Sequence, residues 1–306
     1  MLYTTTTPAD KRIALRTALA SGRLLQFPGA FNPLSAKLIE DKGFDGVYIS
    51  GAVIAADLGF PDIGLTTQTE VATRAHQISR MTDLPTVVDA DTGFGEPMNA
   101  ARTIQALEDA GVSGLHIEDQ VNPKRCGHLD GKAVVDTDTA VKRIRAAVSA
   151  RRDENLVIIA RTDIRAVSGL PSAIDRAKAL VDAGADVLFP EAMADLSEFE
   201  AVRNAVDVPV LANMTEFGKS ELFSAQQLAD IGINIVIYPV SLLRLAMGAA
   251  ERGLDTLRSE GSLRNAVGSM QTRARLYELL DYAAYNDFDS SVFDFEVPGE
   301  AGRSTS

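Results

Sequence analysis

The sequence has 306 residues, of which 46% are hydrophobic and 24% charged, the proportions of a globular protein with a sizeable core. The net charge of −12 argues against nucleic acid or an anionic membrane as a partner, because a phosphate-binding surface requires an excess of lysine and arginine. No apolar run approaches the roughly 20 residues of a membrane-spanning helix. The single cysteine can form no internal disulfide, so we expect a cytoplasmic protein.

A helix start and eight strands follow one another along the chain. Thr7 can cap a helix that has Pro8 at its first position. After that helix, short runs rich in Val, Ile and Leu recur, each followed by a longer amphipathic stretch. Such runs indicate strands that are covered on both faces. They lie at 24–30, 46–50, 86–91, 114–119, 157–162, 187–191, 209–214 and 235–240.

The segments between these strands are long enough for crossover helices, for instance at 67–82, 97–110, 136–152 and 170–183. Eight βα units within about 220 residues predict an α/β protein with a closed (β/α)8 barrel, a TIM-type barrel, rather than an open sheet. We expect one domain over 1–306, with the barrel core at about 10–240.

A weak internal repeat supports the number of units. Gly43, Gly111, Gly184 and Gly232 each precede an even-numbered strand by a few residues. A helix ends readily in a left-handed glycine. We therefore expect these four glycines to terminate helices.

The sequence after the eighth strand predicts more helix than a barrel needs. Helices are expected at about 241–259 and 270–284, followed by a terminal extension over 286–306. The barrel requires one closing helix, so the surplus tail at about 241–285 must pack on the barrel wall or on another subunit. We expect an oligomer.

Polar residues occur where the predicted strands end. In a (β/α)8 barrel the active site lies at the carboxyl ends of the strands, so polar side chains there predict a catalytic site. They are Tyr48, Ser50, Asp89, Asp91, His116, Glu118, Asp119, Arg161, Asp163, Glu191, Asn213, Thr215 and Tyr238.

Two carboxylates stand two residues apart in "VVDADTGFGEP". This spacing directs Asp89 and Asp91 to the same side of the strand, near Glu118 and Asp119 of the next strand. Oxygen ligands of this kind suit Mg²⁺ or Mn²⁺. The alternative is a capped turn, since Asp and Gly are ordinary turn residues.

The cysteine stands among cations in "NPKRCGHLDGK". Lys124, Arg125 and His128 flank Cys126, and Gly127 gives local freedom. Cations lower the pKa of a thiol, which favours proton transfer or nucleophilic attack. The alternative is a small buried residue. A metal-binding Cys–His pair is disfavoured because there is no second cysteine.

Three arginines are candidates for carboxylate binding. Arg161 at a strand end suits bidentate binding of a carboxylate, or else an ion pair with Asp163 or Glu191. Arg244 and Arg273 lie in predicted helices, where arginines usually face solvent.

At this point "KRCGH" after "HIEDQ", "DADTGFG", "ARTD", "LFPEA", "ANMTEFG" and "MQTRARLYELL" can be taken together. From about residue 10 to about 285, in unbroken order, the chain resembles the isocitrate lyase and phosphoenolpyruvate mutase superfamily. Within it the chain is most similar to the short-form 2-methylisocitrate lyases. The cysteine loop marks the carbon–carbon lyase branch.

The resemblance implies an Mg²⁺-dependent lyase that splits the tricarboxylate 2-methylisocitrate into pyruvate and succinate, in the methylcitrate cycle of propionate catabolism. It also implies the barrel fold and a homotetramer in which the closing helix is exchanged between subunits.

The resemblance also implies residue roles. Asp89 and Asp91 would hold the metal, with Asp62 and Glu118 bonded to its waters. Cys126 would be the general acid. For the base we favour Tyr48, with a metal-bound water as the alternative. Substrate contacts would come from Ser50, Gly51, Ala52, Asp62, Lys124, Arg125, Gly127, His128, Arg161, Glu191, Asn213, Met214, Thr215, Arg244 and Arg273.

One departure concerns the serine loop. Many relatives have three glycines after the serine, whereas this chain reads "SGAVIAADLG", one residue shorter. The backbone contacts at Gly51 and Ala52 are the ones affected.

Other functions remain open. Within the superfamily they are a lyase for isocitrate or dimethylmalate, or an oxaloacetate hydrolase. A catalytically silent barrel that binds a dicarboxylate would lack a metal or acid residue, and none is missing. A phosphate-handling barrel is disfavoured because no glycine-rich loop follows strands seven or eight.

Overall fold

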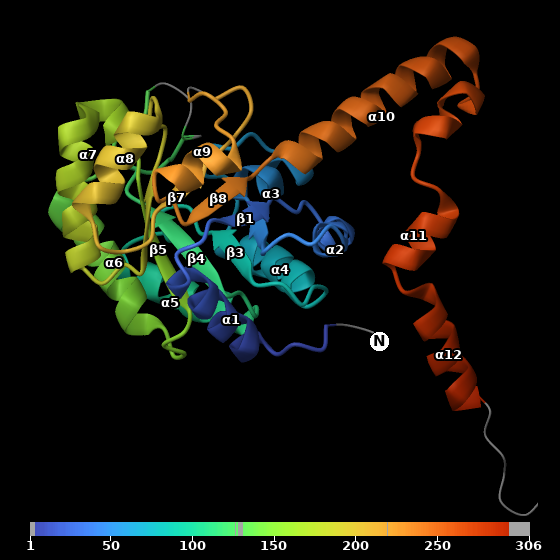
Figure 1. Ribbon diagram of the computed structural model, residues 1–306, viewed down its shortest axis with the longest axis horizontal. Coiled ribbons are helices and arrows are strands. Elements are labelled where there is room, and N and C mark those ends of the chain that lie inside the picture. The colour runs from blue at the N-terminus through green and yellow to red at the C-terminus, as the bar shows by residue number, and fades with distance from the viewer. Residues whose placement is uncertain (1–3, 126, 128–130, 219, 294–306) are drawn as a thin grey trace, which may run out of the picture.

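The computed structural model describes residues 4–125, 127, 131–218 and 220–293, which form a ring of eight parallel strands surrounded by helices (Figure 1). Hydrogen bonds join the strands as β1-β8-β7 and as β2 through β6. Bridges from Gly29 to Tyr48 and from Leu188 to Val210 close the ring. The predicted (β/α)8 barrel is therefore confirmed. The strands are β1 (Leu25–Pro28), β2 (Val47–Ile49), β3 (Thr86–Asp89), β4 (Gly114–Glu118), β5 (Val157–Thr162), β6 (Val187–Pro190), β7 (Leu211–Asn213) and β8 (Ile235–Tyr238).

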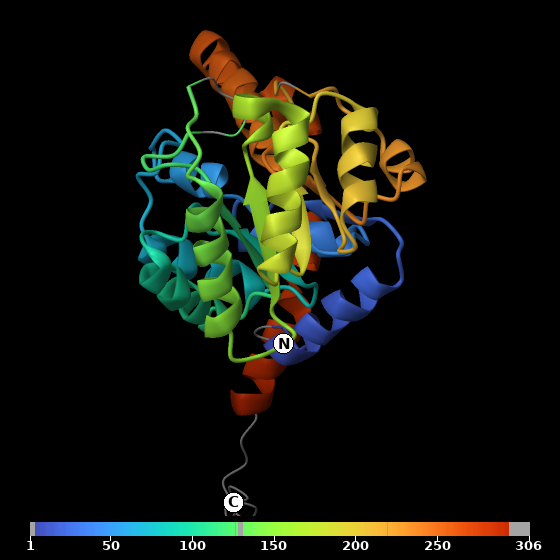
Figure 2. The same cartoon turned by 90° about the vertical axis from the view of Figure 1, so that its left-hand side faces the viewer.

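Helices cover the outside of the ring, as the turned view also shows (Figure 2). Two helices, α3 (Gly51–Asp57) and α4 (Gln68–Ser79), follow β2 before β3 begins, and the sequence predicted only the second. The helices around the ring are α1 (Pro8–Ala20), α2 (Pro33–Asp41), α3 (Gly51–Asp57), α4 (Gln68–Ser79), α5 (Pro97–Asp109), α6 (Thr137–Ala150), α7 (Arg165–Asp182), α8 (Leu196–Ala205) and α9 (Ala225–Asp230).

The inside of the barrel is filled by alternate residues of the strands. Side chains along a strand point alternately to its two faces. Leu25, Val87, Val157 and Ile235 belong to one buried cluster within the ring. Their neighbours, such as Val88 and Ile158, pack instead against the surrounding helices. This alternation also decides which polar side chains at the strand ends face the axis.

Helix α1 closes the amino-terminal end of the barrel. Thr7 caps it as predicted, by accepting a hydrogen bond from the Asp10 main-chain nitrogen. Leu15 and Leu19 join the cluster within the ring. Lys11 is buried beneath them, and its Nζ donates to the main-chain oxygen of Ser79 at 2.8 Å. This end of the barrel is thus plugged, and the opposite end remains for chemistry.

The glycine repeat has the predicted conformation. Gly43, Gly111, Gly184 and Gly232 have φ angles of 74°, 86°, 102° and 79°. Each follows the end of a helix, at α2, α5, α7 and α9. The left-handed region admits glycine at little cost, so the prediction is confirmed at all four positions.

The tail leaves the barrel as α10 (Ser241–Glu260), η1 (Arg264–Ser269), α11 (Arg273–Leu279) and α12 (Tyr282–Phe293). The prediction of one helix over 270–284 is wrong, because Asp281 has a φ of 55° and separates two helices. Helix α12 extends into the segment expected as a terminal extension. Helix α10 projects away from the barrel and has no buried residue in this chain (Figure 1).

No helix among the described residues is both long enough and apolar enough to span a membrane.

Candidate active site

Glu118, the last residue of β4, and Asp119, which follows it, point in opposite directions. Glu118 faces the axis of the barrel, where its Oε2 lies 3.1 Å from Arg161 Nε. Asp119 faces outward, and its carboxylate accepts hydrogen bonds from Thr162 Oγ1 at 2.6 Å and from Arg176 Nη1 at 2.7 Å. The expectation that both acids lie near the metal is therefore wrong for Asp119, which anchors the wall of the barrel.

Asp89 and Asp91 lie together at the end of β3 and are both buried. The main-chain nitrogen of Asp91 donates to Asp89 Oδ1 at 3.0 Å. The main-chain nitrogen of Gly51 donates to Asp89 Oδ2 at 3.2 Å. A Cβ added at Gly51 would lie only 2.9 Å from that oxygen. The start of α3 can therefore approach the carboxylates because residue 51 is glycine.

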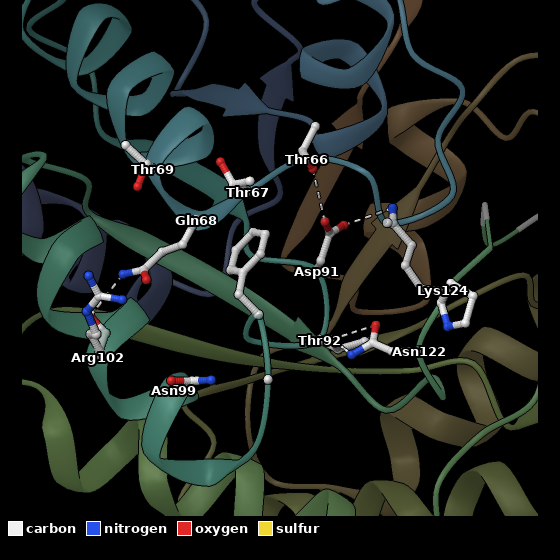
Figure 3. A pocket seen from close by; sticks show the side chains of 14 residues that line it. Thr66, Thr67, Gln68, Thr69, Asp91, Thr92, Asn99, Arg102, Asn122 and Lys124 are labelled. Atoms are coloured by element: carbon white, nitrogen blue, oxygen red, sulfur yellow. Dashed lines mark hydrogen bonds and ion pairs between the residues drawn. The ribbon is translucent and has the colours of Figure 1, made fainter.

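Lys124 reaches these carboxylates from the loop after β4 (Figure 3). Its Nζ lies 2.8 Å from Asp91 Oδ1 and also forms an ion pair with Asp62. Burial, together with the neighbouring Asp89, raises the pKa of Asp91 to about 6 despite the lysine. A cavity of about 640 Å³ opens beside Asp91 and Lys124, lined also by Thr66, Asn99, Arg102 and Asn122.

The ion pairs and hydrogen bonds of the carboxylate cluster indicate whether it can hold a divalent ion. Among the described residues, Asp62 and Asp91 pair with Lys124, Asp163 pairs with Lys132, and Arg161 pairs with Glu118, Asp163 and Glu191. Glu118 Oε1 is buried and accepts no hydrogen bond from these residues. A dication with its bound waters would supply that partner.

The donor set also limits the kind of ion. Among the residues that the structure describes, no three His, Cys, Asp or Glu side chains converge as ligands of one metal. Mg²⁺ commonly takes one or two protein carboxylates and completes its shell with water and substrate oxygens. Asp89 and Asp91 fit that pattern.

Arg161 is held by acids on three sides. Its Nε lies 3.1 Å from Glu118 and 3.0 Å from Asp163, and its Nη2 lies 3.6 Å from Glu191. Phe189 lies beneath the guanidinium, 5.1 Å from ring centroid to Cζ. The predicted alternative of an ion pair is thus present for both Asp163 and Glu191. It fixes the orientation of Arg161 for any carboxylate ligand.

Gly127, the residue after Cys126, lies against Arg161 and Glu191. A Cβ added at Gly127 would lie 2.2 Å from Glu191 Oε1 and 2.4 Å from Arg161 Nη2, so glycine alone permits this approach. Lys132 binds the main-chain oxygen of Gly127 and also Asp163 Oδ1, the latter at 2.7 Å. Cys126 and His128 lie outside the described residues.

Arg125 in the same loop points back onto its own segment. The Gln120 side chain binds both main-chain groups of Arg125. Its Oε1 accepts from Arg125 N at 2.9 Å, and its Nε2 donates to Arg125 O at 2.8 Å. Its Nη1 donates to the main-chain oxygens of Pro123 and Lys124. The structure therefore places the Arg125 side chain outside the carboxylate cluster.

Tyr48 and His116 form a buried pair below the carboxylates. The Tyr48 hydroxyl lies 2.6 Å from His116 Nε2, and Phe189 packs edge-on against the imidazole. Burial lowers the pKa of His116 to about 4 and raises the pKa of Tyr48 well above 10, so both are neutral near pH 7. His116 Nδ1 lies 3.7 Å from Asp89 Oδ1. A proton on Nδ1 suits that carboxylate, which leaves Nε2 to accept from the phenol.

The end of β7 completes the ring of polar groups. Asn213 Nδ2 lies 3.3 Å from both carboxylate oxygens of Glu191. Arg244 in the first turn of α10 donates to Thr215 Oγ1 at 3.2 Å. The side chain of Met214 instead packs outside the sheet, where its sulfur accepts from Phe223 N. Met214 can therefore offer a substrate only its main chain.

Of three further predicted site residues, Ser50 and Ala52 lie at the start of α3, whereas Arg273 lies on the tail. Ser50 directly precedes α3, is buried and makes no capping hydrogen bond with its side chain, and Ala52 lies in the first turn. Arg273 begins α11 on the tail, exposed and away from the strand ends (Figure 1). Arg273 therefore lies apart from the strand ends of its own chain.

Sequence reasoning placed His116 among the polar residues of the strand ends without a specific role, and it missed Lys132 and Glu216. The strand period puts His116 on the face of Glu118, two residues later. Lys132 and Glu216 lie in loops, whose course no short-range pattern predicts.

Comparison with known proteins gives consistent matches. The family model of phosphoenolpyruvate phosphomutase matches residues 15–258. A probable 2-methylisocitrate lyase 2 of Corynebacterium glutamicum is 62% identical over 290 residues, which are 95% of this chain and 94% of that protein. A 2-methylisocitrate lyase of Shewanella oneidensis is 46% identical over 92% of this chain and 97% of its own.

Solved structures are similar over nearly the whole chain. An oxaloacetate acetylhydrolase has a TM-score of 0.88 at 33% identity, covering 94% of this chain and 98% of its own. A 2,3-dimethylmalate lyase has a TM-score of 0.87 at 34% identity, covering 99% and 100%. A phosphonopyruvate hydrolase in complex with oxalate and Mg²⁺ has a TM-score of 0.84 at 29% identity, covering 92% and 98%.

Proposed function

The chain belongs to the phosphoenolpyruvate mutase and isocitrate lyase superfamily, and we propose that it cleaves the carbon–carbon bond of 2-methylisocitrate to give pyruvate and succinate. The observation that carries this proposal is the similarity to 2-methylisocitrate lyases over more than nine-tenths of the chain. The cluster at the strand ends supplies the acids, cations and hydrogen-bonding groups that the reaction requires.

Asp89 and Asp91 would hold Mg²⁺, with Mn²⁺ as a second candidate, and Asp62 and Glu118 would bind its waters. The solved phosphonopyruvate hydrolase with Mg²⁺ is a superfamily precedent for this ion. When bound, the ion polarises the substrate's hydroxyl and neutralises charge near it. Gly51 and Lys124 keep the two carboxylates in place.

Cleavage begins with loss of the hydroxyl proton, and we assign its uptake to the Tyr48–His116 pair. A phenol with a raised pKa is a poor base by itself. Tyr48 can accept the substrate proton while it passes its own to His116 Nε2, 2.6 Å away. The carboxylate of Asp89 beside Nδ1 stabilises the imidazolium that results. The pair therefore refines the prediction of Tyr48 as the base.

The electron pair of the broken bond moves onto the succinate fragment, which must be protonated at carbon. We assign that proton to Cys126, the residue before Gly127. The Gly127 backbone lies against Arg161 and Glu191, and cationic groups near a thiol keep its proton transferable. Arg161, Asn213 and Thr215 stabilise the negative charge on the fragment through preorganised ionic contacts and hydrogen bonds, and Glu191 acts through Arg161, with which it pairs.

Carboxylate recognition falls to arginines and to the cysteine loop. Arg161 and Arg244 meet the cluster within one chain. Lys124 contributes its charge beside Asp91, whereas Arg125 and His128 are assigned to loop closure over the tricarboxylate. Ser50, Gly51 and Ala52 offer main-chain groups at the start of α3. The single cysteine remains the ground for expecting a reducing compartment such as the cytoplasm.

The tail supports an oligomer. Met247, Leu254 and Leu257, which lie on one side of α10, are 60%, 66% and 42% exposed in the single chain. A contiguous apolar helix face of this kind is unusual on a monomer. We assign it to a homotetramer with exchanged closing helices, in which Arg273 reaches a neighbouring site.

A comparison of substrates tests the function. Purified protein with Mg²⁺ is given 2-methylisocitrate, isocitrate, 2,3-dimethylmalate or oxaloacetate in parallel, and the products are identified by mass spectrometry. The proposal expects the highest kcat/KM for 2-methylisocitrate. Preference for oxaloacetate, with release of oxalate, would favour the hydrolase that the acetylhydrolase structures represent.

A further inference from the structure

An ion pair at the rim of the site, between Glu216 and Arg244, has no role in the mechanism above. Glu216 lies in the loop after β7, and Arg244 lies in the first turn of α10. Arg244 Nη1 lies 2.9 Å from Glu216 Oε2 and 2.7 Å from the main-chain oxygen of Glu216. The same nitrogen donates to Thr215 Oγ1. Three acceptors thus hold one end of the guanidinium.

Two more contacts restrict the pair. Ser241, the first residue of α10, donates its hydroxyl proton to the second carboxylate oxygen of Glu216. The ring of Phe217 covers one face of the guanidinium, with 5.3 Å between its centroid and Arg244 Cζ. These contacts restrict both the direction of the Arg244 side chain and the rotation of its guanidinium plane.

The remaining donors of Arg244 are left for a ligand. In the described part of the chain, no residue accepts a hydrogen bond from its Nε or Nη2. These two nitrogens form the edge of a guanidinium that binds a carboxylate with two parallel hydrogen bonds.

A second pair in the same chain shows the contrast. Arg165 binds Glu198 through Nε and Nη2, both at 2.8 Å, and so uses that edge fully. Glu216 instead binds Arg244 through Nη1 alone. Its carboxylate orients the arginine in this way without occupying the Nε–Nη2 edge that a ligand needs.

We propose that Glu216 is a positioning residue that holds Arg244 so that its Nε–Nη2 edge receives a carboxylate of the substrate. The inference rests on the proposed function, which takes Arg244 as a carboxylate ligand. It assigns substrate affinity, rather than the chemical step, to Glu216.

The test is a double-mutant cycle read as KM and kcat for 2-methylisocitrate. Glu216→Ala is expected to raise KM about tenfold, the loss expected for a hydrogen bond to a charged group, while kcat changes by less than about twofold. Glu216→Gln should restore most of the affinity, because its amide oxygen can accept from Arg244 and its amide nitrogen can donate to Ser241 Oγ. In an Arg244→Ala background, Glu216→Ala should raise KM by less than about twofold more.

Glu198→Gln is the matched control, since it weakens an arginine pair outside the site, and its KM should equal that of wild type. Thermal melting of each variant establishes folding. An unchanged KM in Glu216→Ala, or an equal rise with and without Arg244, would overturn the inference. A lowered KM would also overturn it, since Glu216 would then compete with the substrate. If Arg244→Ala has a wild-type KM, the ligand role of Arg244 in the proposed function is wrong. If Arg244→Ala has a raised KM but the Glu216 variants have a wild-type KM, only the inference about Glu216 is wrong.

Discussion

The hydroxyl of Tyr48 lies 2.6 Å from Nε2 of His116 inside the barrel, directly below the carboxylates of β3 and β4. The two rings are nearly parallel, at an interplanar angle of 5°. The phenol that sequence reasoning took as a base is thus already bonded to an acceptor, and the two side chains act as one unit.

Tyr48→Phe removes the proton path and keeps the ring. We expect kcat to fall by about 10²–10⁴, the usual contribution of a general base, with little change in Mg²⁺ affinity. Tyr238→Phe is the matched control, because Tyr238 also ends a strand but its hydroxyl donates to Gln26 Oε1, at 3.5 Å. The measurement is steady-state release of pyruvate. Near wild-type kcat in Tyr48→Phe would exclude the pair as the proton acceptor.

The affinity for Mg²⁺ should depend on pH through Asp91. Burial raises its pKa to about 6, so below pH 6 a proton must leave before the ion can bind. The dissociation constant is expected to rise about tenfold for each pH unit below 6 and to be flat above 7. Calorimetric titration with MgCl₂ at pH 5 and pH 7.5 checks this. Equal affinities at the two pH values would contradict the assignment of Asp91 as a ligand.

Gly127→Ala should prevent the cysteine loop from reaching its position. The added Cβ would meet Glu191 and Arg161 at 2.2 and 2.4 Å, far inside van der Waals contact. We expect kcat/KM to fall by about 10², as for a small displacement of a catalytic group, with an unchanged melting temperature. Gly268→Ala is the control, since its Cβ would meet open space. An active Gly127→Ala enzyme would show that catalysis does not use this loop position.

Charge on the apolar face of α10 should disrupt the oligomer. Met247→Glu combined with Leu254→Glu places two charges on one side of the helix, where these side chains are 60% and 66% exposed in the single chain. We expect light scattering to find a multiple of 32.7 kDa for wild type and a smaller species for the variant. Ser259→Glu, on the exposed end of the same helix, should leave the mass unchanged. A monomeric wild type would refute the assembly.

The barrel was predictable because its signals are local and periodic. Apolar strand runs, the Thr7 cap and glycines such as Gly43 and Gly184 depend on neighbours a few residues away. Strand alternation also predicts that polar residues at the strand ends share one face. The tail was less predictable, since the break at Asp281 depends on a left-handed backbone angle that few residues other than glycine adopt.

The sequence predicted which residues belong to the candidate site better than it predicted which of them contact one another. The positions of Asp89, Glu118 and Arg161 follow from strand ends, whereas the outward turn of Asp119 required the register of β4. The bond between Tyr48 and His116 joins residues 68 positions apart, and that of Arg244 with Glu216 depends on how a loop meets a helix. No short-range pattern encodes such distances, so the geometry had to come from the structure.

The most direct test of the account measures pyruvate and succinate released from 2-methylisocitrate by the wild-type protein, before chelation, after EDTA, and after Mg²⁺ is returned. The account predicts equimolar pyruvate and succinate, loss of both with EDTA, and recovery with Mg²⁺. Turnover that persists without the ion, or no pyruvate from 2-methylisocitrate under any of the three conditions, would contradict it.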